Sequence, residues 1–346
     1  MLNFTGPYIY PDKPIHYFFS GKASSSTMSL DQSLQFLRQW GQTALSHLPP
    51  EAQNVLLHPV VPKALAVLVG LGMGAGPWQP ARELVLITGG CSGIGKQIVN
   101  DLAPTGVRII ILDIQEPSYK LSPNVTFYKA DITSSASIAT VADKIRSAHG
   151  DPTVLVNNAG VGNDGPILEQ SEAKIRQTFE VNTISHFLTV REFLPSMVKQ
   201  NHGHVITIAS MASFIAQGEI VDYCCSKASA LAFHEGLGQE LRFCYKAPKV
   251  RTSVIHPFWV RTPMIKQLID AGKEFRQPII TPEMVSAAVV KQILTQSSGQ
   301  IILPNHLMPI SLVRAFPSWV QDLVRNVGSK DLKHLREWQA SQGLKP

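Results

Sequence analysis

Charge and cysteine are both scarce in this sequence, and each scarcity excludes a class of protein. Only 16% of the 346 residues are Asp, Glu, Lys or Arg, whereas 44% are hydrophobic. A chain of this length and composition can bury a large core, so the bulk of it is not disordered. The four cysteines have neither metal-ligand spacing nor the pattern of a disulfide framework. We therefore expect an intracellular, reduced protein without a metal site.

Two other signals are missing. The first residues lack the charged and then apolar pattern of a secretory signal, so secretion is not expected. The net charge of +6 comes from scattered rather than clustered basic residues. This scatter argues against a nucleic-acid partner and for a mildly basic surface, with an anionic membrane surface as the alternative partner.

Residues 1–82 form an N-terminal extension ahead of the regular part of the sequence. Apolar residues at helical spacing predict an amphipathic helix over 31–48. Residues 55–76 are strongly apolar, but their uncharged run, 64–76, is shorter than the roughly 20 residues that span a bilayer. We expect this segment to bind a membrane interface or else to pack against the following domain.

Residues 83–304 alternate short β-branched runs with segments of helical periodicity, which is typical of a parallel sheet buried on both faces. They predict an α/β fold, a doubly wound parallel sheet (Rossmann) of about seven strands with helices on both faces. The expected strands are 84–88, 107–113, 125–129, 153–157, 204–210, 251–256 and 300–303.

Residues 305–346 are expected to form a C-terminal helical extension. An apolar stripe runs along it, made of Trp319, Val320, Leu323, Val324 and Val327. We expect this stripe to pack on the domain, to pair with a second subunit or to touch a membrane, in that order of preference.

A glycine-rich loop follows the first expected strand and precedes a helix. Gly89 permits the tight turn, Gly93 lets the backbone approach a pyrophosphate, and Gly95 lets the helix pack close to the strand. The free N–H groups and the helix dipole then favour the phosphates. This order of elements predicts a dinucleotide site, although a glycine-rich loop alone is often just a tight turn.

Asp113 ends the second strand, 18 positions after Gly95, close to the interval of about 20 that dinucleotide-binding folds show. Its carboxylate can bond both hydroxyls of an adenosine ribose and would repel a 2′-phosphate. Neither Cys91 nor Ser92 supplies a positive charge to attract that phosphate. We therefore predict NAD rather than NADP, the alternative being that Asp113 is only a strand-end acid or a helix N-cap.

Tyr223 and Lys227 lie four positions apart, which on a helix places both side chains on one face. The ammonium is expected to lower the pKa of the tyrosine from about 10, so that Tyr223 can take a proton from an alcohol or return it. Ser210, at a strand end, can donate to the developing alkoxide. The alternatives are a surface helix pair and a hydroxyl that caps a turn.

Residues 83 to about 304 resemble the short-chain dehydrogenase/reductase family. The resemblance rests on Ser210, Tyr223 and Lys227 together with Thr88-Gly89-x-x-x-Gly93-x-Gly95, Asn157-Asn158-Ala159-Gly160 and Asn182. The resemblance implies that Ser210, Tyr223, Lys227 and Asn182 are catalytic, with Asn182 anchoring a water that links Lys227 to solvent. It implies that the cofactor is bound by Thr88, Gly89, Cys91, Ser92, Gly93, Ile94, Gly95, Asp113, Asp131, Asn158, Ala159, Gly160, Tyr223, Lys227, Val260 and Thr262.

Some of these cofactor residues have more specific roles by the same resemblance. Residues 157–160 would stabilise the central strand and shape the adenosine side, and Asp131 would touch the adenine. The Val260 backbone and Thr262 would bond the nicotinamide carboxamide. Phe258 stands where the family has a glycine, which leaves the path of that loop open.

Within the family, the sequence resembles the branch of retinol and 17-beta-hydroxysteroid dehydrogenases. The features that carry this resemblance are Phe258, Asp113 and the apolar N-terminal segment. The resemblance implies hydride transfer between a nicotinamide and a primary or secondary alcohol, or a carbonyl, of a lipophilic substrate such as a retinoid, steroid or polyketide-like molecule. Two alternatives stay open: an NADPH-dependent ketoreductase of a biosynthetic pathway, and a non-catalytic protein that binds dinucleotides or lipid surfaces.

The remaining expectations concern the substrate, the assembly and the location. The substrate pocket is expected to be apolar, unless its residues only cover the core. Its expected lining is Met211, Phe258, Trp259, Met264, Ile265, Leu268, Ile269 and Phe275. The family resemblance implies a homo-oligomer. We expect an intracellular location, at the endoplasmic reticulum membrane or lipid droplet surface or otherwise in the cytoplasm.

Overall fold

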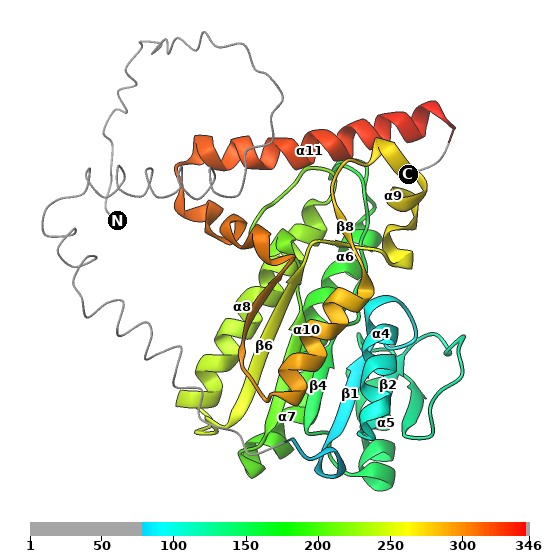
Figure 1. The fold of residues 1–346 in the computed structure, drawn as a ribbon, viewed down its shortest axis with the longest axis vertical. Helices are drawn as coiled ribbons and strands as arrows, with labels where there is room; N and C mark the ends of the chain where they lie inside the picture. The colour runs from blue at the N-terminus through cyan, green and yellow to red at the C-terminus, as the bar shows by residue number, and fades with distance from the viewer. Residues whose placement is uncertain (1–77, 344–346) are drawn as a thin grey trace, which may run out of the picture. The chain divides into compact units, whose positions relative to one another are not determined.

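Seven parallel strands form the central sheet of residues 78–343, the part of the chain that the computed structural model describes. Their order across the sheet is β3-β2-β1-β4-β5-β6-β9, and every neighbouring pair is parallel (Figure 1). The strands are β1 (Leu84–Thr88), β2 (Arg108–Asp113), β3 (Val125–Lys129), β4 (Val154–Asn157), β5 (Gly203–Ile208), β6 (Val250–Pro257) and β9 (Gly299–Leu303).

The sheet is buried on both faces because alternate residues of each strand meet a different layer of helices. In β1, Val85 and Ile87 join one hydrophobic cluster, while Leu84 and Leu86 join another. The first cluster includes apolar residues of α4 (Gly93–Leu102) and α10 (Pro282–Leu294). The second includes residues of α5 (Ser135–His149), α7 (Ser185–Gln200) and α8 (Val221–Phe243). The prediction of a doubly wound Rossmann sheet is confirmed.

The topology places several loops at one edge of the sheet. The chain turns outward to opposite sides after β1 and β4, which are neighbours, so the loops beyond their carboxyl ends flank a crevice. Loops after β5 and β6 reach the same edge. Two additional short strands, β7 (Trp259–Val260) and β8 (Ile279–Ile280), pair with each other beside it and were not predicted, because two-residue strands leave no periodic pattern.

The C-terminal extension folds as η7 (Asn305–Ala315) and α11 (Ser318–Ser341). Figure 1 shows α11 lying across one end of the sheet. The buried residues of α11 are Gly328, Leu332, Leu335 and Gln339. The expectation that the apolar stripe packs on the domain is wrong for three of its members, because Trp319, Leu323 and Val327 are 66%, 61% and 66% exposed.

The amphipathic helix expected over 31–48 and the membrane-binding or packing segment expected over 55–76 both lie outside the described residues. Among the helices between residues 78 and 343, none combines the length and the apolarity needed to cross a membrane.

The packing of α7 against the sheet gives a stability prediction. Phe193 is 1% exposed and is among the largest fully buried side chains. Replacing it with alanine leaves a cavity, so Phe193→Ala should lower the free energy of unfolding by about 3–5 kcal/mol. Phe243→Ala, at a phenylalanine that is 74% exposed, should change it by less than about 0.5 kcal/mol. Urea denaturation of both variants measures this, and equal effects would contradict the assigned core.

Candidate active site

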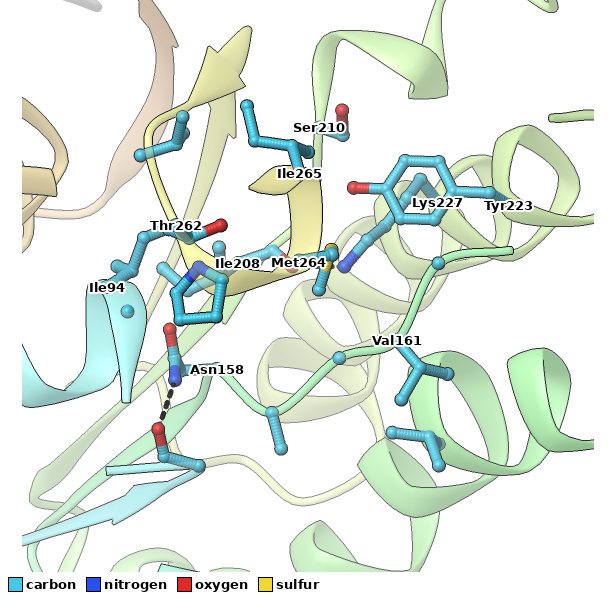
Figure 2. Close-up of a pocket in the computed structure, with 18 of the residues that line it drawn as sticks. Ile94, Asn158, Val161, Ile208, Ser210, Tyr223, Lys227, Thr262, Met264 and Ile265 are labelled. Carbon is cyan, nitrogen blue, oxygen red and sulfur yellow. Dashed lines mark hydrogen bonds between the residues drawn. The ribbon is translucent and has the colours of Figure 1, made fainter. Parts of the chain in front are cut away.

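One cavity of about 580 Å³ opens at this edge of the sheet, and it is lined by both the dinucleotide loop and the expected catalytic residues. Its wall combines residues from the loops after β1, β2, β4, β5 and β6 with Leu332 of α11. Figure 2 shows Ile94 and Asn158 toward one end and Ser210, Tyr223 and Lys227 toward the other. The cavity therefore brings together residues that are far apart in the sequence.

The glycine-rich loop makes a turn that side chains would block. Gly89 has a φ of +68°, a backbone conformation that favours glycine. A Cβ atom at Gly95 would lie 2.2 Å from the carbonyl oxygen of Gly89, so the start of α4 packs directly on the turn. Ser92, the N-cap residue of α4, makes no side-chain capping bond, which leaves N–H groups at the helix N-terminus for a ligand. These features fit a dinucleotide phosphate.

Asn158 and Thr88 connect the turn after β1 to the turn after β4. The Asn158 side-chain amide donates to the carbonyl oxygens of Thr88 (2.9 Å) and Gly89 (3.1 Å). Figure 2 marks a hydrogen bond of the Asn158 side chain with a dashed line. In return, the Thr88 hydroxyl oxygen accepts from the backbone N–H groups of Asn158 and Ala159, both at 3.0 Å. Thr88 is not among the described residues that line the cavity. Its role is to hold the two turns together.

Asp113 lines the cavity and organises the cofactor loop. Its Oδ2 atom accepts from the backbone N–H of Cys91 at 2.9 Å, and its Oδ1 atom accepts from that of Gln115 at 3.0 Å. The Cys91 side chain is buried away from the cavity wall, and burial, followed by the charge of Asp113, raises the pKa of its thiol to about 12. Any contact of Cys91 with a cofactor would therefore be through its backbone.

Ser210 comes two residues after β5 and begins the short helix η4 (Met211–Ser213). Its hydroxyl accepts from the backbone N–H of Ala212 at 3.2 Å and is 3.4 Å from the carbonyl oxygen of Pro257. The Nδ1 atom of His256 is 3.0 Å from the Ser210 carbonyl oxygen. Both the backbone and the hydroxyl of Ser210 are thus positioned by β6.

Tyr223 and Lys227 face the cavity from the first turns of α8, as their spacing predicts. Lys227 is 4% exposed, its Nζ atom donates to the Ile208 carbonyl oxygen at 3.0 Å, and it lies 5.6 Å from the centre of the Tyr223 ring. Burial lowers the pKa of Lys227 to about 8.

The pKa of Tyr223 differs from the sequence-based expectation. Burial raises it to about 12, and hydrogen bonding with Ser210 offsets part of that rise. The expectation that the Lys227 ammonium lowers this pKa from about 10 is therefore wrong for the protein without cofactor, because desolvation of the phenolate is the largest influence and raises the pKa.

Asn182 lies in a π-helical turn, η3 (Glu180–Ile184), between α6 (Glu172–Phe179) and α7. Its side-chain oxygen accepts from the backbone N–H of Val161 at 2.9 Å, and its amide donates to the Val161 carbonyl oxygen at 2.8 Å and to the Ser226 hydroxyl at 3.0 Å. A Cβ atom at Gly160 would lie 3.3 Å from the Asn182 oxygen and 3.6 Å from Nζ of Lys227. Asn182 thus connects the loop after β4 to α8, and it is not among the described residues that line the cavity.

The loop after β6 forms another part of the cavity wall. Val260 and Thr262 both line it, and a Cβ atom at Gly93 would lie 3.2 Å from Cγ2 of Thr262. Phe258 does not disturb this contact, although it replaces the family's glycine. Of the other expected cofactor residues, Ser92, Ile94, Asp131, Asn158, Ala159 and Gly160 also line the cavity, whereas Gly95 supports it from behind.

The expected substrate residues are partly rearranged. Met211, Phe258, Trp259, Met264, Ile265 and Leu268 line the cavity. Phe275 instead packs edge-on against Trp259, with 5.4 Å between the ring centres, and Ile269 lies outside the wall that the described residues form. The sequence reasoning missed Gln217 and Leu332. Gln217 lies in the sequence between Ser210 and Tyr223, and this position could have predicted a place in the pocket wall. No local signal identifies Leu332.

Within residues 78–343, His, Cys, Asp and Glu side chains form no cluster able to hold a metal ion.

Lys227 gives a prediction on pH and stability. Its pKa is about 8 when folded and near 10.5 in the unfolded chain, so between these values the unfolded state binds more protons. The free energy of unfolding of the wild type should therefore rise relative to that of Lys227→Met, by about 2 kcal/mol, as the pH goes from 8 to 10.5. Thermal and urea unfolding without cofactor measure the difference. A difference that stays flat over this range would contradict the buried amine.

Comparison with known proteins identifies the family. Residues 83–272 match the family model described as short chain dehydrogenase. Estradiol 17-beta-dehydrogenase 11 of Macaca fascicularis is 36% identical over 241 residues, which are 67% of this chain and 78% of that protein. Dehydrogenase RED2 of Cochliobolus heterostrophus is 44% identical over 180 residues, 51% of this chain and 68% of that protein.

A solved structure supports the same fold. The 3-ketoacyl-(acyl-carrier-protein) reductase from Brucella melitensis complexed with NADH aligns with a TM-score of 0.58 at 18% identity, over 65% of this chain and 98% of that one. At this identity the likeness concerns the fold alone. The family predicted from the sequence is confirmed: the chain belongs to the short-chain dehydrogenases/reductases and is an NAD(P)-dependent oxidoreductase.

Proposed function

We propose that this enzyme transfers a hydride between NAD and a hydroxyl or carbonyl group of a lipophilic substrate. The observation that carries the proposal is the composition of the cavity wall. Ser210, Tyr223 and Lys227 stand together on it, while most of the surrounding side chains on the substrate side are apolar. An apolar pocket with few polar groups at one place favours an apolar molecule that presents a single reacting oxygen there.

The proton chemistry follows from these three side chains. The Ser210 hydroxyl donates a hydrogen bond to the substrate oxygen and stabilises its developing negative charge. In reduction, the Tyr223 phenol, which is protonated at neutral pH because of its raised pKa, gives its proton to that oxygen. In oxidation, the phenolate accepts the hydroxyl proton, and the charge of Lys227 stabilises the phenolate. The nicotinamide, when bound, accepts or supplies the hydride.

Asp113 supports NAD as the cofactor. Its carboxylate lies in the cavity wall at the end of β2, where it would repel a 2′-phosphate. Lys96, the nearest basic residue along the loop, lies 4.8 Å from the centre of the Tyr119 ring. Lys96 is not among the described residues that line the cavity.

The relatives support a lipophilic substrate. Estradiol 17-beta-dehydrogenase 11 is named for a steroid, and a cavity walled by Met211, Ile215, Trp259 and Leu268 suits a molecule of that character. Retinoids and polyketide-like molecules have the same combination of an apolar body and one reacting oxygen.

We further propose that the enzyme is a homo-oligomer and acts at the surface of the endoplasmic reticulum or of lipid droplets. Exposed Ile184, Phe187 and Phe243 on the helices around Asn182 and Tyr223 support self-association. Met308 and Leu312 of η7 are also exposed, in addition to Trp319, Leu323 and Val327 of α11. We call these five residues the η7–α11 apolar surface. With exposed Arg314 and Lys330 beside it, this surface has the chemistry of an interfacial helix on anionic lipid.

Initial rates with a panel of lipophilic alcohols and ketones test the chemistry. Tyr223→Phe should lower kcat by at least about 100-fold, because it removes the proton donor and acceptor. Tyr245→Phe, at a tyrosine that is 45% exposed, should retain the wild-type rate. An active Tyr223→Phe enzyme would overturn the assigned role.

The cofactor proposal has its own variant. Asp113→Asn retains one of the two side-chain oxygens that accept from the backbone and removes the negative charge. It should raise the ratio of kcat/KM with NADP to that with NAD by about tenfold, the effect of roughly 1.4 kcal/mol of repulsion. A wild-type preference for NADP would instead favour the biosynthetic ketoreductase.

Flotation of the full chain with phosphatidylcholine vesicles containing phosphatidylserine tests the membrane proposal. The double variant Leu323→Asp/Val327→Asp should float at least about fivefold less, since charges replace apolar contacts with lipid. Leu168→Asp, at a leucine that is 99% exposed elsewhere, should float like the wild type. Unchanged flotation of the double variant would remove the η7–α11 apolar surface as a membrane contact.

A further inference from the structure

Gln217 places an amide in the apolar part of the cavity wall. Its side chain is half-buried and lines the cavity together with Met211, Ile215, Ile220 and Leu332. The backbone N–H of Gln217 lies 3.5 Å from the sulfur of Cys224. The side-chain amide, by contrast, forms no hydrogen bond with another residue of the described part of the chain. A half-buried polar group without a partner is costly unless something else satisfies it.

Other amide side chains on the cavity wall differ from Gln217. Asn163 donates to the Lys174 carbonyl oxygen at 3.2 Å and to the Thr178 hydroxyl at 2.8 Å, so its donors are used. Gln177 and Gln267 are exposed to solvent, which can satisfy them. Gln217 is therefore the amide whose hydrogen-bonding capacity points to a ligand.

A glycine in α11 leaves space for the Gln217 side chain. Gly328 lies in the middle of this helix, where glycine costs about 1 kcal/mol relative to alanine. A Cβ atom at position 328 would lie 2.1 Å from Nε2 of Gln217 and 2.6 Å from its Cδ. The absence of a side chain thus creates the space in which the Gln217 amide lies against the helix.

Neighbouring contacts fix the helix at this point. The Ser329 hydroxyl accepts from the backbone N–H of Gly218 at 2.9 Å, immediately beside Gln217. On the other side, the Gln277 amide nitrogen lies 3.5 Å from the carbonyl oxygen of Gly328. One turn further along α11, Leu332 reaches the cavity. The amide is therefore presented by a fixed frame rather than by a free loop.

We propose that Gln217 is a specificity-determining residue that hydrogen-bonds a second polar group of the substrate, on the α11 side of the cavity. The inference rests on the proposed function and narrows its substrate class to bifunctional lipophilic alcohols, such as steroid diols or long-chain diols. A primary amide both donates and accepts, so a hydroxyl or a carbonyl satisfies it equally. A substrate without this group leaves the amide unpaired, which lowers its kcat/KM.

Paired substrates test this directly. The pairs are estradiol with its 3-deoxy analogue and α,ω-diols of eight to fourteen carbons with the matching mono-alcohols, each assayed with NAD. The wild type should favour the best bifunctional member of a pair by at least about tenfold in kcat/KM, since a lost hydrogen bond to a half-buried amide costs about 1–2 kcal/mol. In Gln217→Met, which retains the length of the side chain but not its polarity, the ratio should fall to within about twofold of unity.

Two further variants separate this role from a general loss of structure. Gly328→Ala should lower the same ratio, because its Cβ atom displaces the amide, while the melting temperature remains the same or rises owing to the better helix former. Gln239→Met, at an exposed glutamine of α8 away from the cavity, should retain the wild-type ratio.

The outcomes distinguish the inference from the function on which it rests. Turnover of mono-alcohols and bifunctional partners at equal kcat/KM in the wild type, or a ratio unchanged by Gln217→Met, overturns the role of Gln217 and leaves the proposed function standing. If NAD binds but no member of any pair is turned over, the proposed function and the inference both fail.

Discussion

The burial of one amine constrains much of this active site. Lys227 is 4% exposed in a wall that is otherwise largely apolar, and its charged form loses most of its hydration there. The surroundings compensate only in part. The Ile208 carbonyl oxygen accepts from Nζ. The Ser213 hydroxyl donates to the backbone carbonyl oxygen of Lys227 at 2.7 Å, which positions the helix and leaves the amine itself without a second hydrogen-bond partner among the described residues. Gly160 has no side chain to displace the amine. These contacts bring the ends of β4 and β5 and the start of α8 into one rigid arrangement around it.

Much of the fold could be predicted because its signals are local. β1 and β3 have the predicted bounds, and the other five strands of the main sheet differ by no more than two residues at either end. Strands that are buried on both faces are nearly continuous β-branched runs, so their position is readable without tertiary information. The proposed catalytic residues could also be named in advance, because the family spacing of Ser210, Tyr223 and Lys227 is itself a sequence property.

Properties that arise from tertiary packing were not readable in this way. The pKa of Tyr223 depends on how completely the protein excludes water, and that cannot be judged from a lysine four residues away. Cys91 sits within the cofactor loop in the sequence, yet its thiol turns into the core. The sequence-based expectation chose the wrong side of α11 as the side that packs on the domain. Helical periodicity identifies an apolar stripe, but it does not show whether that stripe or another side of the helix is buried. Its covered residues are Gly328, Leu332 and Leu335 rather than the more hydrophobic Trp319 side.

The place of α11 in the chain has a consequence for biogenesis. Every residue assigned to the dinucleotide lies between Thr88 and Thr262, whereas Leu332, which completes the substrate wall, lies far beyond them. During synthesis, the cofactor groove can be assembled while the wall facing the substrate is still missing its last helix. Dinucleotide binding can therefore precede maturation of the substrate pocket.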